Sequence, residues 1–221
     1  IIGDDPIYIE QCANTSSIAM YADSASALDN VDGIVPTTNY SNLDYTTVGT
    51  YYHRYIASDS KNNIDSVDRV LIVTQDTIPP VITLLGNLVD TINVYSAYVD
   101  AGEMSTDTCA GINTVTVTGK VDTSKVGAYT LIYTAYDNNG NFASASRMVY
   151  VLDRQPPTIT IVGLDTLNLE VHGTFTDKGV TVDDNYWSLD QSNVVVTGSV
   201  DMTTLGEYVL TYSITDSSGN G

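Results

Sequence analysis

Basic residues are scarce in this sequence. The chain holds 8 Lys and Arg against 27 Asp and Glu, which gives a formal net charge of −19. An acidic chain repels phosphate groups, so nucleic acids and anionic membrane surfaces are poor partners. The longest apolar runs are far too short to cross a bilayer. We therefore expect no nucleic-acid partner and no membrane insertion in this region.

Cysteine and enzyme motifs are also nearly absent. Cys12 and Cys109 are the only cysteines, so no disulfide framework holds the fold. The sequence contains no Gly-x-Ser-x-Gly, His-Glu-x-x-His, Cys-x-x-Cys or phosphate-binding glycine loop. The two histidines, His53 and His172, lie far apart in the sequence, and His53 is expected to be a neutral residue at the edge of a core. The sequence predicts a protein that is not an enzyme.

Residues typical of half-buried strands make up much of the chain. Tyr, Thr, Val, Ser and Ile are frequent, and apolar residues alternate with a period of two, as at Tyr129, Leu131, Tyr133 and Ala135. Turns rich in Gly, Asn and Asp separate these runs, and no convincing helix is found. The pattern predicts an all-β, antiparallel sandwich.

A motif occurs three times. Gly-x-Tyr-x-x-x-Tyr begins at residues 49, 127 and 206, about 78 residues apart. Each copy opens on proline and β-branched residues: "DDPIYIE" at 4, "PPVITLLG" at 79 and "PPTITIVG" at 156. The predicted repeats are 1–76, 77–153 and 154–221, with residues 1–3 as the tail of an earlier repeat.

The paired tyrosines of this motif are expected to have structural roles. The first of each pair is typical of a tyrosine corner, in which a phenol hydrogen-bonds back to nearby backbone. We expect that first tyrosine to be largely buried and the second to lie on the same face further along the strand. The pairs are Tyr51 and Tyr55, Tyr129 and Tyr133, and Tyr208 and Tyr212.

The second repeat resembles the tandem bacterial Ig-like surface repeats. It carries "PPVITLLG", "VDTSKVGAYTLIYTAYDNNGN" and "ASASRMVYVLD", which match that family's units nearly throughout. The resemblance implies Ig-like sandwiches in an elongated array, within the extracellular stalk or spacer region of an adhesin-type bacterial surface or secreted protein. It brings no catalytic residues.

Two other functions stay open at this point. The repeats could bind a glycan or a protein, and Tyr186 and Trp187 could stack on a sugar ring, although the single Trp of an Ig-like unit is more often buried. The third repeat stops before its last strand. That favours a window of a longer repeat array, and the alternative is a filament in which another subunit supplies the strand.

Ca²⁺ is the one ligand that the residues could serve. If the number of strand passes in a repeat is odd, the entry prolines, the loop after the central aromatic-Asp motif and the last hairpin turn meet at one pole. Carboxylates there are hard oxygen ligands suited to Ca²⁺, although Asp also forms turns and keeps a surface soluble. The candidates are Asp76, Asp107 and Asp137 at the first repeat boundary, and Asp153, Asp183, Asp184 and Asp216 at the second.

The same parity suggests a disulfide at the first repeat boundary. It places the loop of Cys109 at the pole that faces the first repeat, and Cys12 follows the opening strand of that repeat. The hypothesis is therefore a disulfide between Cys12 and Cys109. The alternative is that Cys12 lies in the middle of its domain, out of reach of Cys109.

Overall fold

The computed structural model describes residues 5–13 and 25–221. The chain divides into two compact units. The first consists of Ile1–Gly86, Ala101–Thr118 and Ile132–Ser146, and the second of Asn87–Asp100, Gly119–Leu131 and Arg147–Gly221. Because the division passes through the second sequence repeat, each unit contains one of the two repeat boundaries.

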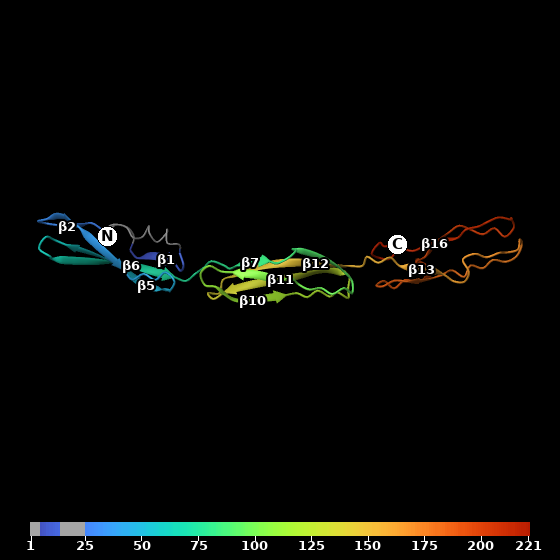
Figure 1. Ribbon diagram of the computed structural model, residues 1–221, viewed down its shortest axis with the longest axis horizontal. Coiled ribbons are helices and arrows are strands. Elements are labelled where there is room, and N and C mark those ends of the chain that lie inside the picture. The colour runs from blue at the N-terminus through green and yellow to red at the C-terminus, as the bar shows by residue number, and fades with distance from the viewer. Residues whose placement is uncertain (1–4, 14–24) are drawn as a thin grey trace. The chain divides into compact units, whose positions relative to one another are not determined.

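Regular structure in the described residues consists of strands and one short 3₁₀ helix (Figure 1). The elements are β1 (Ile7–Glu10), β2 (Ala27–Asp29), β3 (Gly33–Val35), β4 (Thr37–Ser41), β5 (Gly49–Ser58), β6 (Ile64–Thr74), β7 (Val81–Leu84), β8 (Val89–Asn93), β9 (Glu103–Thr106), β10 (Ile112–Thr118), β11 (Gly127–Asp137), β12 (Phe142–Leu152), β13 (Thr158–Ile161), β14 (Val180–Asp183), the 3₁₀ helix η1 (Gln191–Asn193), β15 (Val195–Thr197) and β16 (Thr211–Ser213). The all-β prediction is confirmed, and within the described residues no helix is long and apolar enough to cross a membrane.

The first repeat is built on a sheet with the order β1-β6-β5-β4. Strands β5 and β6 form a long antiparallel ladder, from the pair Gly49 and Val73 to the pair Ser58 and Ile64. Their residues alternate between buried and exposed, as a sheet with one face on a core requires. Strand β1 adds a parallel edge to β6, which brings Ile9 against the core.

The second repeat follows a related plan. One sheet has the order β10-β11-β12-β8, and β7 pairs with β9 in a separate antiparallel ladder. Strand β8 runs parallel to β12, as β1 does to β6. The antiparallel prediction is therefore incomplete, because the chain leaves the β7 ladder and joins the other sheet alongside its last strand. In the third repeat β13 pairs with β14, and β15 pairs with β16.

These pairings also correct the alignment of the opening strands. Ile9 of β1 pairs with Val73, and Ile92 of β8 pairs with Val151 in the same way. The stretch "DDPIYIE" thus corresponds to β8 and not to the "PPVITLLG" segment, which contains β7. Alternation along a strand does not specify its partner, so the sequence pattern could not separate the two assignments.

Each tyrosine corner has the expected hydrogen bond. The phenol of Tyr51 donates to the backbone oxygen of Thr47, that of Tyr129 to Lys125 and that of Tyr208 to Thr204. The predicted burial is wrong, since Tyr51 and Tyr129 are half-buried and Tyr208 is 36% exposed. The hydroxyl turns back toward the chain four residues earlier, so part of the ring stays exposed even where it packs against the core, as Tyr51 does. The second tyrosines of the first two pairs, Tyr55 and Tyr133, are buried, and Tyr212 is half-buried.

Each of the two large sheets contains a buried arginine, Arg69 in β6 and Arg147 in β12. Arg147 is 1% exposed, and its guanidinium lies 3.1 Å from a carboxylate oxygen of Asp100 and 3.8 Å from one of Asp90. The equivalent Arg69 lies 5.9 Å from the ring centre of Tyr55. A charge this deeply buried requires partners, and Asp90 and Asp100 supply them for Arg147.

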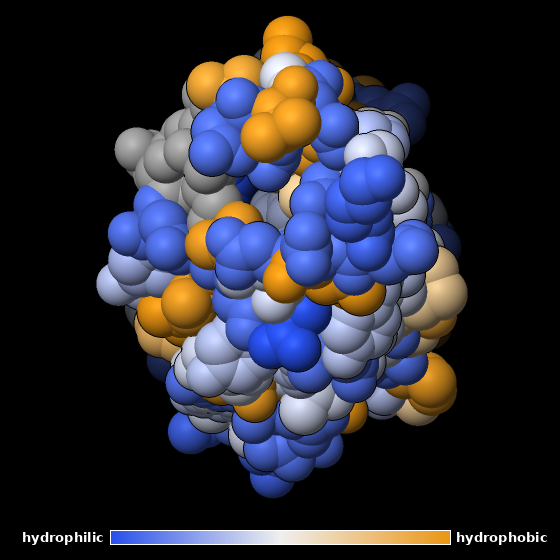
Figure 2. Space-filling view, turned by 90° about the vertical axis from the view of Figure 1, so that its left-hand side faces the viewer, coloured by the Kyte–Doolittle hydropathy of each residue, from blue (hydrophilic) through white to orange (hydrophobic). Residues whose placement is uncertain are grey.

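The surface at the β2 end of the first unit is mixed in polarity. Leu28, Val31 and Ile34 are largely exposed there. Figure 2 shows this end, with apolar groups spread among hydrophilic ones. Scattered apolar residues are normal on a soluble surface and identify no site.

Candidate metal sites

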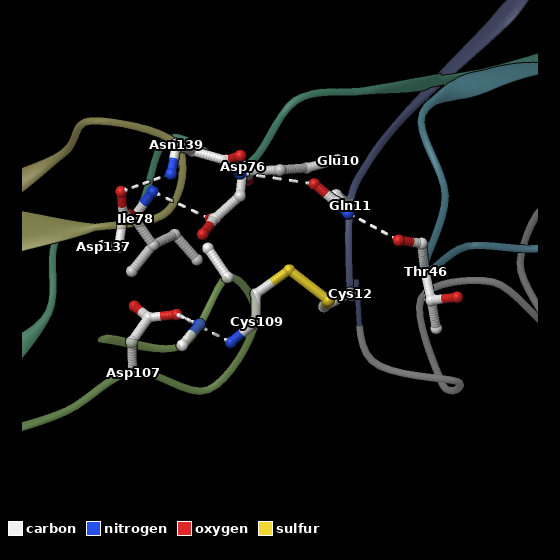
Figure 3. Close-up of a disulfide and its surroundings, with 12 residues drawn as sticks. Glu10, Gln11, Cys12, Thr46, Asp76, Ile78, Asp107, Cys109, Asp137 and Asn139 are labelled. Carbon is white, nitrogen blue, oxygen red and sulfur yellow. Dashed lines mark hydrogen bonds between the residues drawn. A yellow bond between two sulfur atoms is a disulfide. The ribbon is translucent and has the colours of Figure 1, made fainter. Parts of the chain in front are cut away.

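Three carboxylates come together in the first unit. One oxygen each of Asp76, Asp107 and Asp137 lies within 4.8 Å of the others. Asp76 follows β6, Asp107 follows β9 and Asp137 ends β11. Figure 3 shows the three residues arriving from separate chain segments beside a disulfide. The structure thus brings together all the candidates that the sequence placed at this boundary.

Local turns hold these carboxylates in place. Oδ1 of Asp137 accepts the backbone N–H groups of Asn139 and Asn141, both at 2.8 Å, and its Oδ2 accepts the side-chain amide of Asn141 at 2.7 Å. Oδ1 of Asp107 accepts backbone N–H groups two and four residues further on. Oδ1 of Asp76 accepts the N–H of Ile78 at 3.0 Å. Each acid therefore uses Oδ1 to form its own turn.

The second unit repeats this arrangement. Oxygens of Asp153, Asp184 and Asp216 also lie within 4.8 Å of one another. Oδ1 of Asp153 accepts the N–H of Gln155, and Oδ1 of Asp184 accepts the N–H of Trp187 at 2.6 Å. Asp216 repeats the turn of Asp137, with Asn220 in place of Asn141. Members of the two clusters are about 77 to 79 residues apart, so the cluster belongs to the repeat unit.

Asp183 is the one candidate that the structure leaves outside. It ends β14, where it is exposed and pairs with Thr158. Asp184 lies in the loop after the strand, where its Oδ1 accepts the N–H groups of Tyr186 and Trp187, so Asp183 and Asp184 do not act as a pair. Asn141 and Asn220 lie at the clusters but were not among the residues predicted from the sequence. Each lies four residues after a cluster Asp, and its amide also donates to the backbone oxygen of the linker Asp.

A disulfide lies next to the first cluster. The structure joins Cys12 and Cys109, which are 97 residues apart in the sequence. The backbone N–H of Cys109 donates to Asp107 Oδ1, so the bond anchors the loop that carries this carboxylate. Cys12 itself has a positive φ of 58° and follows β1.

Aromatic residues take the corresponding positions in the second unit. Tyr95 follows β8 with a φ of 62°, as Cys12 follows β1, and Tyr186 lies two residues after Asp184, as Cys109 does after Asp107. The rings of Tyr95 and Tyr186 lie 6.1 Å apart, and the Tyr186 hydroxyl accepts the N–H of Val126. The same pair of positions is thus covalently joined in one unit and joined by aromatic contact in the other.

Several buried oxygens of the clusters have no hydrogen-bond partner. They are Oδ2 of Asp76, Asp153 and Asp184. Asp76 is 1% exposed and Asp153 is 5% exposed. Within residues 5–13 and 25–221 no ion pair reaches a cluster carboxylate, and those of Arg54, Lys125 and Arg147 join other aspartates. A buried anion without compensation is costly, so these oxygens need a positive partner.

Hydrogen bonds keep the hairpin members of the clusters charged. Burial pushes the pKa of Asp137 upward, but the side-chain and backbone donors of Asn141 and the N–H groups of Asn139 and Gly140 outweigh it, so that pKa lies below its ordinary value. The pKa of Asp216 is lowered by the same balance, with burial opposed mainly by Asn220. An ionised carboxylate is the form that a cation binds.

The described part of the first repeat has the same turns, and no complete cluster is found there. Oδ1 of Asp59 accepts the N–H groups of Lys61 and Asn63, and its Oδ2 accepts the Asn63 amide, as in the hairpins of the other repeats. Asp29 accepts the N–H of Val31 as Asp107 accepts that of Cys109. No group of three potential ligands that includes Asp59 or Asp29 is found among residues 5–13 and 25–221. The turn alone does not make a cluster.

A family of known proteins matches the second and third repeats. The family described as "Bacterial surface protein, Ig-like domain" matches residues 82–151 and 159–221, more than half of the chain. The chain belongs to the bacterial surface Ig-like domain family. Membership in this family agrees with the sandwich architecture and supports a surface, extracellular setting for the Ig-like repeats. No match was found among curated proteins.

Solved structures similar to this Ig-like chain differ widely in their coverage. The lipoprotein BT2262 from Bacteroides thetaiotaomicron is 25% identical with a TM-score of 0.32, over 38% of this chain and 45% of that one. The protocadherin GammaB4 extracellular domain is 13% identical with a TM-score of 0.37, over 89% and 39%. Protocadherin Gamma B2 extracellular cadherin domains 1-5 are 12% identical with a TM-score of 0.36, over 97% and 52%. This chain therefore spans about half or less of the length of each.

Proposed function

We propose that this chain is a non-catalytic spacer, or stalk, region of an adhesin-type bacterial surface or secreted protein. In this view the three repeats, 1–76, 77–153 and 154–221, are consecutive Ig-like domains, and their partners are first of all each other. The observation that carries the proposal is the recurrence of one domain plan. The corner tyrosine and the Asp-x-x-x-Asn hairpin are present three times at nearly constant spacing.

The links between repeats support a spacer role. Pro79-Pro80 and Pro156-Pro157 begin three residues after Asp76 and Asp153, at the points where one repeat passes into the next. Proline fixes its own φ and keeps the preceding residue extended, so these links should resist folding back. Rigid modules joined by stiff links separate whatever is attached to their two ends.

A glycan-binding role finds less support. The aromatic residues that could stack on a sugar already have partners inside the protein. Trp187 is half-buried and donates from its indole nitrogen to Ser218, and its ring lies 4.9 Å from that of Tyr186. Tyr186 in turn contacts Tyr95. These contacts favour a structural role for both residues.

Small-angle X-ray scattering of the purified chain tests the spacer proposal. A single compact body of this length would have a radius of gyration of about 17 Å. Three domains strung out by stiff links should give a value well above that, and replacing both proline pairs by Gly-Gly should lower it. A measured value near 17 Å would refute the proposal.

A further inference from the structure

We propose that the clusters of Asp76, Asp107 and Asp137 and of Asp153, Asp184 and Asp216 are two Ca²⁺ sites. The proposal goes beyond the spacer function and does not depend on it. The six carboxylates form two groups of three, and a bound cation in each group would neutralise their charge. Each site lies inside one compact unit, so its geometry does not depend on how the two units are placed.

Closeness of acids alone does not make a site, since exposed acids often cluster without a ligand. The decisive observation is the state of individual oxygens. Asp76 is only 1% exposed, and its Oδ2 is buried without a hydrogen-bond partner. Asp153 repeats this in the second cluster, and Oδ2 of Asp184 is also buried and without a partner. The linker aspartate of both clusters therefore has a buried Oδ2 without a hydrogen-bond partner.

The two oxygens of these carboxylates have different roles, and the difference fits a metal ligand. Oδ1 accepts from the backbone of its own turn and fixes the position of the side chain, as at Asp107 and Asp184. Oδ2 of the linker acid is left for a ligand. Even Asp137 and Asp216, whose Oδ2 accepts one amide hydrogen, retain further lone pairs for a cation.

The donor set selects the ion. All three residues of each cluster offer oxygen, and neither cluster contains a histidine or a cysteine as a candidate ligand. Hard oxygen donors suit Ca²⁺ or Mg²⁺ and not Zn²⁺. Three carboxylates on separate, turn-held segments provide the high ligand charge and adaptable geometry that Ca²⁺ prefers, whereas Mg²⁺ usually takes only one or two carboxylates and keeps several waters. Water can complete the remaining positions.

The disulfide distinguishes the two sites. Cys109 donates its backbone N–H to Asp107, so the covalent bond to Cys12 holds one ligand loop of the first site. The matching loop of the second site is held by the contact of Tyr186 with Tyr95. A preorganised site loses less freedom on binding. The first site is therefore expected to bind Ca²⁺ more tightly than the second, and to lose that advantage when the disulfide is reduced.

Calorimetric titration of the chelator-treated 221-residue chain with CaCl₂ is the direct test. The expected result is two bound ions per chain, with dissociation constants between about 10⁻⁵ and 10⁻³ M. Saturating Ca²⁺ should raise the melting temperature by about 5 °C or more relative to chelator. MgCl₂ at equal concentration should give a clearly smaller shift. Absence of heat together with an unchanged melting temperature would overturn the proposal.

Matched variants assign the sites. Asp153→Asn should remove one ion, and Asp183→Asn, which changes the same charge in the same boundary region outside the cluster, should remove none. Asp137→Asn should remove the other ion, and Asp59→Asn, which alters the same hairpin turn without a cluster, should again leave two. If a control variant loses an ion, or both cluster variants retain two, the assignment is wrong.

Melting in chelator separates a binding role from a merely structural one. Without the ion, Asp153→Asn relieves repulsion among buried carboxylates, so it should melt at the wild-type temperature or above. In Ca²⁺ it should melt below the wild type. This reversal of sign requires an ion. A variant that is less stable by the same amount in both buffers would refute the proposal for that cluster.

Terbium luminescence provides a second, site-specific measurement. Tb³⁺ occupies Ca²⁺ sites and emits when a nearby indole is excited. The sole tryptophan, Trp187, is bonded through its backbone to the ligand Asp184. Emission excited through Trp187 should therefore appear with the wild type and with Asp137→Asn, and should be lost with Asp153→Asn. Emission that persists in Asp153→Asn would contradict the second site.

Discussion

Removing the disulfide between Cys12 and Cys109 should destabilise the first repeat far more than the third. In the chain-entropy model, a cross-link that closes a loop of about 97 residues lowers the entropy of the unfolded chain by about 16 cal/mol/K, or about 4.7 kcal/mol at 25 °C. If the second repeat stayed folded while the first unfolded, the loop would still contain about 70 residues and give about 4.4 kcal/mol. The estimate therefore depends little on how the repeats unfold.

The perturbation is the double variant Cys12→Ser, Cys109→Ser. Because measured effects often fall below this model, a loss of 2 to 5 kcal/mol is expected. Urea unfolding combined with amide hydrogen exchange of β1, β5 and β6 measures it. The fluorescence of Trp187, which lies in the third repeat, reports the unfolding of that repeat and should keep its midpoint.

Reduction of the wild type should reproduce the variant's stability, and a reducing agent should leave the variant unchanged. A loss below about 1 kcal/mol in the first repeat would show that the cross-link does not restrict the unfolded chain as the entropy model assumes. An equal loss reported by Trp187 would mean that the first and third repeats unfold together, which would refute this reasoning.

Three further changes test the fold by urea unfolding. Gly119→Ala should cost at least about 2 kcal/mol, since a methyl group there would meet a backbone carbonyl of β11 at a φ of 93°, whereas Gly140→Ala has a similar φ and open space and should cost less. Arg147→Met removes the partner of two carboxylates and should cost about 3 to 5 kcal/mol, and a loss below 1 kcal/mol would mean that the ion pairs are dispensable. Burial first and the nearby Arg69 second lower the pKa of His53, so its contribution to stability is present above the unfolded value of about 6.5 and is lost as the pH falls toward the lower folded value. His53→Leu should abolish this loss between pH 7 and 5, and an unchanged pH profile would contradict it.

Strand periodicity and repeat spacing in the sequence were sufficient to predict the all-β fold. The expectation of an odd number of strand passes in each repeat also predicted which loops meet. It placed the segments of Asp76, Asp107 and Asp137 at the same end of the repeat. What local patterns lack is information on pairing. The parallel edge strands β1 and β8 alternate like any antiparallel strand, so their partners could be read only from the structure.

Errors at individual residues have equally local causes. Asp183 and Asp184 are adjacent in the sequence, but Asp183 ends β14 and Asp184 begins the turn after it, so only Asp184 joins the cluster. The alternation of β11 predicts a buried Tyr129, yet its hydroxyl bonds to the backbone oxygen of Lys125 and the residue stays half-buried. Asn141 resembles any turn asparagine in the sequence, and its role appears only when its amide is seen donating to Asp76 and Asp137 together.

The cross-link between Cys12 and Cys109 also determines the path of a mechanical load. When the chain is pulled from its two ends, tension entering before Cys12 passes through the two sulfur atoms to Cys109, and the segment between them carries none of it. Strands β2 to β9 are thus shielded from force, whatever the stability of their hydrogen bonds. About 97 residues, or roughly 320 to 350 Å of extended chain, are withheld from extension until the bond is reduced. The oxidised chain therefore has a shorter maximum extension than the reduced chain.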